Sequence, residues 1–520
     1  MPPDSGAPHT STSEPTRTSG RIDAVLETVE RVGNRIPHPF VLFLYLFVLI
    51  AVASTVMDGL NVSVTVPGDD SATEVNGLLQ MEGLVWFLTS FVTNFMSFPP
   101  LGNVVVMLLA IGVAEQSGFL RAAITTMFAR APRAVLPYVV AFVAAQGHVM
   151  SDPSMIVIPP LAALVFLAAG RHPLAGMLGA FACTTAGYAS GILLGSLDAL
   201  LSGITTESTK IVASIETTPV NIASNWYFSA VSGIVLPLVG GFIIDRVLEP
   251  RLGQYHGTED DKPQALTSVE KKGLVAALGA VTVVAAAAVT AWLAPRSPFR
   301  GEGGVLVPSP FLDALVPQLM LLFFVAGITY GVVTRAITRA ADVPEMMGEA
   351  MKALAGYVVF IFIAAQVIAI FTWSGVGTVV AVQLANALEA IGVTGFGAVV
   401  GLVLIASLVN LFITSGSAMW ALMAPVMVPT FALIGLEPGF IQAAYRIGDS
   451  TTQLITPLNP YLIVLLGFAR RYEPDLQFGA LIARMVVFVP VFWIVWVLIL
   501  LVFYLGGFPV GPGMPIYLEK

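Results

Sequence analysis

Long apolar stretches separated by short polar connections dominate the chain. Stretches of about 20 residues can cross the ~30 Å hydrocarbon layer of a bilayer as α-helices. A lipid environment leaves no water for exposed backbone groups, so helices are the elements that such stretches form. We therefore predict nine transmembrane spans, at 38–57, 84–119, 174–200, 224–245, 272–293, 312–335, 351–390, 438–463 and 484–507.

Two of these stretches, 84–119 and 351–390, are longer than one crossing needs. The first is interrupted at Phe98–Gly102, which contains two prolines, and the second at Trp373–Gly377, which contains two glycines. Proline and glycine break or bend helices. We predict that each stretch is a bent or steeply tilted helix.

Two further apolar segments carry a polar break. The segment 135–170 is interrupted at His148–Ser154, and the segment 396–434 at Thr414–Ser417. The arms on either side are shorter than a crossing requires, which favours re-entrant hairpins. Irregular backbone at membrane depth is tolerated only where protein or water satisfies it, so we expect both tips to point into a protected interior.

The two hairpins belong to a pattern that occurs twice. Each is followed by a helix rich in residues that interrupt helices, and a motif P-x9-G-x2-P recurs at an offset of 265 positions. The motif residues are Pro160, Gly170, Pro173 and Pro425, Gly435, Pro438; the interrupting residues are Gly187, Gly191, Gly195 and Gly448, Pro457, Pro460. The predicted spans make the first hairpin open to the cytoplasm and the second to the outside. Such an inverted repeat is typical of transporters with a midplane binding site.

The composition agrees with a membrane protein and excludes other classes. Of 520 residues, 56% are hydrophobic and 11% are charged, whereas soluble domains carry about 25% charged residues. The single cysteine excludes a disulfide framework, the five histidines lack metal-ligand spacing, and no basic stripe favours nucleic acid. We predict an all-α polytopic membrane protein with about nine transmembrane helices, two re-entrant hairpins and an inverted repeat with broken helices.

The domain organisation follows from the same pattern. Lys and Arg cluster in alternate connections, and this asymmetry marks the cytoplasmic side. It predicts a cytoplasmic N-terminus and an external C-terminus. The predicted parts are a polar tail with an amphipathic helix (1–36), a first membrane repeat (37–246), a cytoplasmic linker (247–271), a second membrane repeat (272–510) and a C-terminal tail (511–520).

Few charged residues lie inside the predicted spans and hairpins, where each costs about 2.5–3.5 kcal/mol at the bilayer centre. Asp152 lies at the first hairpin tip, and Asp198 either takes part in transport or lies at the outer membrane surface. Arg446 and Asp449 are three positions apart and share a helix face. They form an internal ion pair, or else Gly448 opens the helix, Asp449 coordinates a cation and Arg446 binds an anionic substrate group.

Several neutral residues are candidates for the same site. Asn410, before the second tip, offers a neutral oxygen of the kind that sodium prefers. Ser417 begins the returning arm, where a helix N-terminus attracts a carboxylate. Trp420 either stacks on an aromatic substrate or is a packing residue. Pro438 and Pro457 favour a geometric role.

Other functional classes fit the sequence less well. Gly448-Asp449 is similar to part of the G-x-G-D motif of membrane aspartyl proteases, but Arg446 replaces the first glycine. Ser417 and His148 have no spacing that supports a hydrolase dyad. A channel also contains hairpins and broken helices, but the inverted repeat favours coupled transport.

These residues also form motifs of a known family. The chain resembles the p-aminobenzoyl-glutamate transporter (AbgT) family over nearly all of its length after residue 30. The motifs are Asn410–Phe412, Ser415–Ala421, Ala424–Val426, Gln442–Ser450, Ile455–Leu458, Ser151–Asp152, Gly170–Gly176, Pro100–Gly102 and Gly112–Glu115.

The resemblance implies a homodimer in the bacterial inner membrane, each subunit with nine spans and two hairpins. It implies transport of p-aminobenzoyl-glutamate driven by an ion gradient, and family members have also been assigned efflux of sulfonamide antimetabolites. It places Asn410 and Asp449 on a sodium site. It places on substrate or transport positions Asp198, Ser417, Trp420, Pro438, Arg446 and Pro457.

Two departures from the family pattern alter possible ion ligands. Ser190-Gly191 replaces an expected Ser-Asn, and Thr452-Gln453 replaces an expected Thr-Asn. We expect an ion-coupled secondary transporter and not an enzyme, with sodium or a proton as coupling ion, no other cofactor, and a small anionic aromatic substrate. The rival expectation is a proton-driven sulfonamide efflux pump, with Asp449 or Asp198 as proton carrier.

Overall fold

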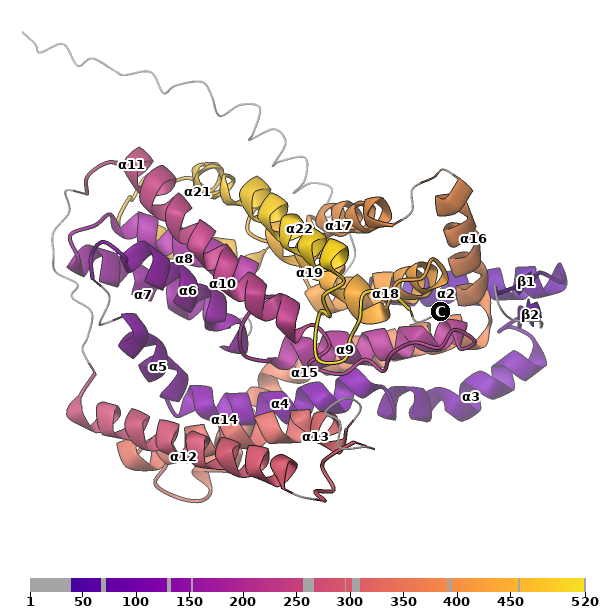
Figure 1. The fold of residues 1–520 in the computed structure, drawn as a ribbon, viewed down its shortest axis with the longest axis horizontal. Helices are drawn as coiled ribbons and strands as arrows, with labels where there is room; N and C mark the ends of the chain where they lie inside the picture. The colour runs from indigo at the N-terminus through magenta and orange to yellow at the C-terminus, as the bar shows by residue number, and fades with distance from the viewer. Residues whose placement is uncertain are drawn as a thin grey trace, which may run out of the picture.

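The computed structural model describes residues 39–66, 72–128, 132–150, 153–255, 266–294, 296–301, 309–390, 392, 395–456 and 459–518. Helices form most of the described chain, and many of them run along the long axis of the molecule (Figure 1). The predicted tail and amphipathic helix at 1–36 lie outside the described residues.

The first half contains two short antiparallel strands and a series of helices. In chain order they are α2 (Pro39–Gly59), β1 (Ser63–Thr65), β2 (Ala72–Glu74), α3 (Met81–Met96), α4 (Pro99–Gln116), α5 (Phe119–Phe128), α6 (Leu136–Ala145), the 3-10 helix η1 (Gln146–Met150), α7 (Pro153–Ala168), α8 (Pro173–Gly187), α9 (Ser196–Thr209), η2 (Lys210–Val212), α10 (Trp226–Ile243), the π-helical turn η3 (Ile244–Leu248) and α11 (Glu249–Leu252). Ser63 of β1 pairs with Glu74 of β2.

The second half is helical. Its elements are α12 (Ser268–Leu293), α13 (Pro310–Asp313), α14 (Leu315–Thr334), α15 (Asp342–Trp373), α16 (Val376–Ala390), α17 (Phe396–Asn410), α18 (Gly416–Leu433), α19 (Pro438–Thr452), α20 (Pro460–Ala469), α21 (Phe478–Met485) and α22 (Phe488–Gly506).

Within the described residues, six helices are long and apolar enough to cross a membrane, and two bent pairs raise that number to eight. The pair α15–α16 bends by 72° at Gly375 (φ +73°), which confirms the predicted break at Trp373–Gly377. The predicted break at Phe98–Gly102 separates α3 from α4, and a further bend of 66° separates α4 from α5. Each of the predicted spans 174–200 and 438–463 is divided between two helices.

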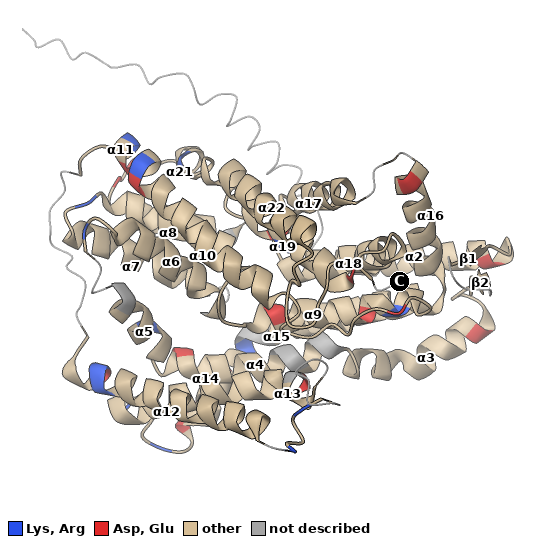
Figure 2. Cartoon of the chain, viewed as in Figure 1, with Lys and Arg blue, Asp and Glu red and all other residues tan. Residues whose placement is uncertain are grey.

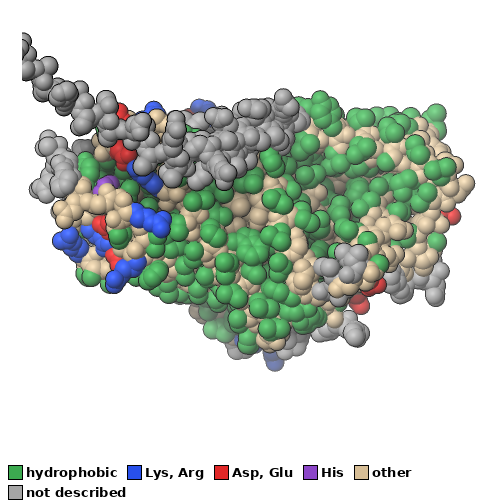
Figure 3. Space-filling model, turned by 90° about the horizontal axis from the view of Figure 1, so that it is seen from above, with side chains coloured by type: hydrophobic (Ala, Val, Ile, Leu, Met, Phe, Trp, Pro, Cys, Tyr) green, Lys and Arg blue, Asp and Glu red, His purple; other side chains and the backbone are tan. Residues whose placement is uncertain are grey.

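The outer surface is apolar over most of its length. Leu88 of α3, Val275 of α12 and Leu505 of α22 are 74%, 72% and 74% exposed. Figure 3 shows a broad band of hydrophobic side chains beside charged side chains gathered at one end. Figure 2 shows that Lys and Arg concentrate at the end formed by α11, α21 and the start of α12. A surface of this kind fits a bilayer.

Both predicted hairpins are present, and they open toward opposite ends of the molecule (Figure 1). α6, η1 and α7 form the first, and α17 and α18 form the second. α6 packs against α8 as α17 packs against α19, so each hairpin rests on the broken helix that follows it. The predicted inverted repeat with broken helices is therefore confirmed.

The two repeats share their helix boundaries. α7 and α18 end at Ala168 and Leu433, and α8 and α19 begin at Pro173 and Pro438 and contain 15 residues each. All of these boundaries are separated by the 265 positions that the sequence motif predicted. Proline at the first helical position lacks only an N–H that has no helical partner, which explains its place in the repeated motif.

The turn between hairpin and broken helix is also the same in both repeats. Gly170 has φ +66° and Gly435 has φ +89°, a backbone region that glycine adopts without strain. The residue after each glycine donates its N–H five residues back, as in a Schellman motif. These bonds join Arg171 to Phe166 at 2.8 Å and Leu436 to Phe431 at 3.0 Å.

One expectation about the second broken helix is wrong. Gly448 does not open the helix, because α19 continues to Thr452 and the break follows between α19 and α20. Instead, Gly448 allows close packing against α17: a Cβ at this position would lie 2.8 Å from the carbonyl oxygen of Val403. Asp449 therefore lies within a continuous helix and not at a break.

Candidate functional site

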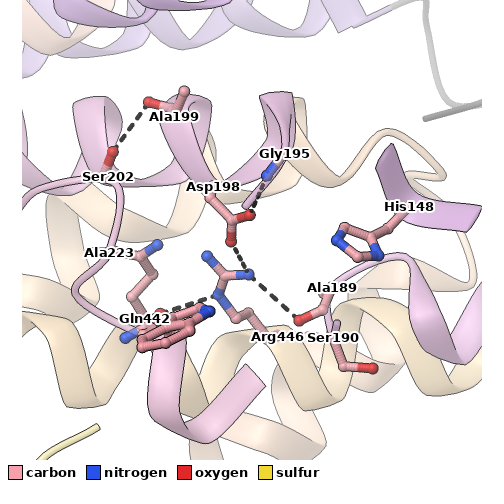
Figure 4. A network of polar contacts seen from close by, with 12 residues as sticks. His148, Ala189, Ser190, Gly195, Asp198, Ala199, Ser202, Ala223, Gln442 and Arg446 are labelled. Carbon is pink, nitrogen blue, oxygen red and sulfur yellow. Dashed lines mark hydrogen bonds and ion pairs between the residues drawn. The ribbon is translucent and has the colours of Figure 1, made fainter. Parts of the chain in front are cut away.

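An ion pair joins the two repeats inside the protein. Nη1 of Arg446 on α19 lies 2.8 Å from Oδ1 of Asp198 on α9, and the side chains are only 2% and 8% exposed. Figure 4 shows the two side chains pointing toward one another. Arg446 thus pairs with Asp198 and not with Asp449, the partner suggested by their spacing. Asp198 is buried and does not lie at an outer surface.

Both members of this pair make further hydrogen bonds. Nε of Arg446 donates to Oδ1 of Asn225 at 3.0 Å, and its Nη1 donates to the carbonyl of Ala189 at 3.3 Å. Oδ2 of Asp198 accepts the N–H of Gly195 at 2.8 Å and so caps α9. These bonds hold the guanidinium against the non-helical segment 188–195 of the first broken helix.

A second polar cluster lies where α17 and α19 pack together. Nδ2 of Asn410 donates to the backbone carbonyl of Asp449 and, at 3.1 Å, to Oγ1 of Thr452. Some buried oxygens of this region have no hydrogen-bond partner among the described residues: Oδ1 of Asn410, both carboxylate oxygens of Asp449, Oγ of Ser450 and Oε1 of Gln453.

These oxygens fit a hard cation. An unpaired buried carboxylate carries a large desolvation penalty, which a bound cation offsets. Carboxylate, amide and hydroxyl oxygens are hard-cation ligands, whereas the described residues contain no group of three or more His, Cys, Asp or Glu side chains placed for a metal ion. Gln453 still offers an amide oxygen where the family pattern predicted asparagine.

The second hairpin tip lies directly against Asp449. A Cβ at Gly416 would stand 2.7 Å from Oδ2 and 2.9 Å from Oδ1 of Asp449, so glycine is required there. The hydroxyl of Tyr445 donates to the carbonyl of Gly416 at 2.6 Å, and Oγ1 of Thr456 donates to the carbonyl of Leu411 at 2.7 Å. The carboxylate of Asp449 and the second hairpin tip are therefore in direct contact.

Trp420 is fully buried in this conformation. Its ring centroid lies 4.4 Å from that of Tyr445, and its Nε1 donates to Oγ1 of Thr205 at 3.0 Å. Thr205 in turn donates to Oε1 of Gln442 at 3.1 Å. The indole thus joins α18 to α9 and α19, and it contacts a substrate only if these elements separate.

Of the remaining predicted positions, Ser417 follows Gly416 at the second hairpin tip, Pro438 lies at the start of α19, and two lie outside the described residues. Ser417 is half-buried in the first turn of α18, with its Oγ 3.1 Å from that of Ser415. Pro438 begins α19, about 12 Å along the axis from Arg446 at 1.5 Å per residue. Asp152 and Pro457 lie outside the described residues.

One important partner was missed by sequence reasoning. Asn225 precedes α10 and binds Arg446 through Oδ1, while its Nδ2 donates to the carbonyl of Gly439 at 2.6 Å. An asparagine next to a predicted span is ordinary, so its type alone gave no signal. Only the fold places it between two turns of α19.

The fold and these clusters can be compared with known proteins. The model of the AbgT putative transporter family matches residues 24–518. This chain belongs to the AbgT family. It is 41% identical over 488 residues, 94% of this chain and 96% of the relative, to the p-aminobenzoyl-glutamate transport protein of Escherichia coli (strain K12).

Two solved AbgT structures are similar throughout. The YdaH transporter of Alcanivorax borkumensis aligns with a TM-score of 0.87 and 34% identity, covering 92% of this chain and 100% of that one. MtrF of Neisseria gonorrhoeae, described within a class of antimetabolite efflux pumps, aligns with a TM-score of 0.89 and 37% identity over 94% of this chain and 100% of that one. This AbgT protein is a multi-pass membrane transporter and not an enzyme.

Proposed function

We propose that this AbgT protein is an ion-coupled secondary transporter of p-aminobenzoyl-glutamate, or of related folate-derived aromatic carboxylates, across the bacterial inner membrane. The Escherichia coli relative, whose name gives this substrate, supports the substrate class. The coupling to an ion rests on one observation: both buried carboxylate oxygens of Asp449 lack a hydrogen-bond partner within the part of the chain that the structure describes.

In this proposal sodium binds at Asn410 and Asp449. The ion neutralises the carboxylate and draws it toward the amide oxygen of Asn410. Because Gly416 touches Asp449, this binding orders the second hairpin tip beside the substrate pocket. Sodium and substrate then raise each other's affinity, since coupling between two sites is reciprocal. One positive charge that moves inward gains about 2.3 kcal/mol per 100 mV of membrane potential. This free energy corresponds to roughly fortyfold accumulation of the substrate.

The substrate pocket is built around Arg446. A glutamyl carboxylate of the substrate accepts hydrogen bonds from part of the Arg446 guanidinium, which in this structure pairs with Asp198. Ser417 and the N-terminus of α18 supply further donors for an anion. Trp420 becomes available to the aromatic ring once α9 and α18 separate. Pro438, Pro457 and Asp152 stay expectations of transport positions.

Flux through proteoliposomes tests the coupling. Radiolabelled p-aminobenzoyl-glutamate uptake is measured with sodium and pH gradients imposed separately. Sodium-driven uptake is expected in the wild-type protein and at least a tenfold loss in Asp449→Asn. The control is Glu349→Gln, which removes an exposed carboxylate paired with Lys352 and should keep full uptake. Full sodium-driven uptake by Asp449→Asn would show that the cation site is wrongly assigned.

The second candidate is proton-driven efflux of sulfonamide antimetabolites, with Asp449 or Asp198 as proton carrier. The similarity to MtrF supports it. It predicts that sulfonamide efflux follows an imposed pH gradient and does not change when sodium is removed. Sodium dependence at constant pH excludes it.

Orientation and assembly complete the proposal. A cytoplasmic N-terminus places the basic end at α11 and α21 in the cytoplasm, in accord with the positive-inside rule. A homodimer is expected from the family. Accessibility labelling of single cysteines in a Cys183→Ser background tests the first, because Cys183 is the one cysteine in the chain. Mass measurement of the detergent-solubilised protein tests the second.

A further inference from the structure

The first hairpin tip carries a histidine whose two ring nitrogens both face carbonyl oxygens. Nε2 of His148 lies 2.6 Å from the carbonyl oxygen of Leu193, and Nδ1 lies 3.2 Å from that of Ala145. The residue is 6% exposed. Figure 4 shows His148 beside the segment that carries Ala189 and Ser190, on an element separate from both members of the ion pair.

In this arrangement an imidazolium makes one more hydrogen bond than a neutral ring. A carbonyl oxygen only accepts hydrogen bonds, and a neutral imidazole has one N–H donor and one acceptor nitrogen. A neutral ring would therefore turn a lone pair toward one of the two carbonyls. The imidazolium donates to both, and the 2.6 Å separation suits a charge-assisted bond.

The chain leaves space for this ring at one glycine. A Cβ at Gly191 would overlap the imidazole of His148. The same short segment is fixed around the ring, because the N–H of Gly191 donates to the carbonyl of Ser229 at 3.0 Å and the N–H of Ile192 donates to Oε1 of Gln146 at 2.9 Å. Glycine at position 191, where the family pattern has asparagine, thus lacks a possible ion ligand and leaves room for the ring of His148.

His148 also lies close to the ion pair of the substrate pocket. The position of a Cβ on Gly195 would be 3.5 Å from Cδ2 of His148 and 3.9 Å from Oδ2 of Asp198, so the two side chains flank one glycine. Arg446 reaches the same segment through the carbonyl of Ala189. A proton on His148 therefore adds positive charge next to the carboxylate that Arg446 holds.

Few other titratable groups occur on the elements packed against η1, which are α4, α6, α7 and α8. Glu115 lies in the last turn of α4, whereas Tyr138 of α6 and Cys183 of α8 contact Gly241 and Gly240 of α10. The described part of α7 has none. Tyr188 lies in the segment after α8, and Asp152 follows η1 outside the described residues.

We propose that His148 is a proton-binding site that ties the first hairpin tip to the non-helical segment of the first broken helix. Taking up a proton from the aqueous phase at one ring nitrogen completes the two bonds to Ala145 and Leu193. Losing that proton breaks one bond, frees the tip and strengthens the hold of Asp198 on Arg446. The effect on transport rests on the proposed function; the protonation of the ring does not.

Nitrogen NMR of the full chain in lipid bilayers tests the protonation directly. The protein is labelled with ¹⁵N-histidine, and the His148 signals are identified by their loss in His148→Gln. At pH 6 both ring nitrogens of His148 should show imidazolium shifts. His172 is the internal reference, because its Nδ1 accepts the N–H of Leu174 and requires the neutral ring. A neutral His148 signal at pH 6 overturns the proposal.

Substrate counterflow in proteoliposomes tests the link to transport. With equal pH on both sides, the wild-type rate should change at least fivefold between pH 6 and pH 8, and that of His148→Gln less than twofold. His172→Gln is the matched control and should keep the wild-type pH profile. An unchanged profile in His148→Gln overturns the link. Loss of sodium-driven uptake in the wild-type protein would instead contradict the proposed function and leave the NMR result standing.

Discussion

Arg446 shows how a single residue connects the two repeats. It shares a helix face with Asp449, yet its guanidinium extends to Asp198 on α9 and to Asn225 before α10. Asp449 is turned instead toward Gly416 at the second hairpin tip. The carboxylates of Asp198 and Asp449 therefore differ, because Arg446 forms an ion pair with Asp198 only.

Removing one partner of the buried pair should destabilise the protein. Asp198→Asn leaves the charge of Arg446 buried, and breaking such a pair costs about 3–5 kcal/mol of unfolding free energy. Glu473→Gln, at a partly exposed pair with Arg484, should cost about 0–1 kcal/mol. Thermal unfolding in detergent measures both. Additive effects in the double variant Asp198→Asn/Arg446→Gln would show that the pair does not interact.

Adding one methyl group at Gly416 tests the cation cluster. Gly416→Ala places a methyl group 2.7 Å from the carboxylate of Asp449, which forces the tip and the carboxylate apart. We expect the sodium concentration for half-maximal uptake to rise at least tenfold. Gly401→Ala in α17 has open space around it and should leave this concentration unchanged. An equal sodium response in both variants would contradict the role of the contact.

At the scale of elements, the two hairpins and broken helices share one backbone plan but differ in their polar residues. The positions of Asn410, Asp449 and Thr452 correspond, 265 residues earlier, to Ala145, Thr184 and Gly187. A Cβ at Gly187 would overlap the backbone of Ala145, so that pair of helices packs closely and leaves no room for ligands. The cluster of unpaired oxygens at this position is thus a property of the second repeat.

The equivalent glycine turns should respond alike to substitution. Gly170 and Gly435 both have positive φ, and a Cβ added at either would meet no atom within 4 Å, so alanine would be strained only through its backbone. Each Gly→Ala change should lower the unfolding free energy by about 1–2 kcal/mol. Gly467→Ala, in open space within α20, should be neutral or slightly stabilising. Differential scanning calorimetry compares the three; a loss in only one of the two turns would argue against their equivalence.

At the scale of the whole molecule, charged residues at one end join several helices. Arg171, after the first hairpin, pairs with Asp245 of η3 at 2.5 Å and with Glu249 of α11. His172 follows and caps α8. Glu473 before α21 pairs with Arg484, which keeps the pKa of its carboxyl below the usual value. These contacts fix the end of the bundle outside the apolar band.

Stability should depend on pH through His172 at this end. Burial lowers the pKa of His172 below its usual value of 6.5. The unfolded chain therefore binds more protons below about pH 6.5, and stability, complete above that value, falls as the pH decreases. His172→Asn retains a capping side chain that does not titrate, so its unfolding temperature should vary less between pH 7 and pH 5. Equal pH dependence in both proteins would contradict this role.

The pattern of the sequence predicted most of the architecture because lipid imposes it. Apolar length identified the single spans, paired breakers identified the bend at Gly375, and polar interruptions identified both hairpins. The motif that recurs after 265 positions located the repeat because its glycine takes a positive φ and its last proline begins a helix. These features depend on neighbours along the chain or on the bilayer.

What the sequence alone determined, then, was the membrane class, the repeat and the residue types that carry charge inside it. The tertiary structure decided which of them meet: Arg446 with Asp198, Asn410 with the backbone of Asp449, and His148 with Leu193. It also decided that Gly448 packs and does not break its helix. The physical reason is that contacts between distant segments depend on how helices cross and approach, which spacing along one helix does not specify.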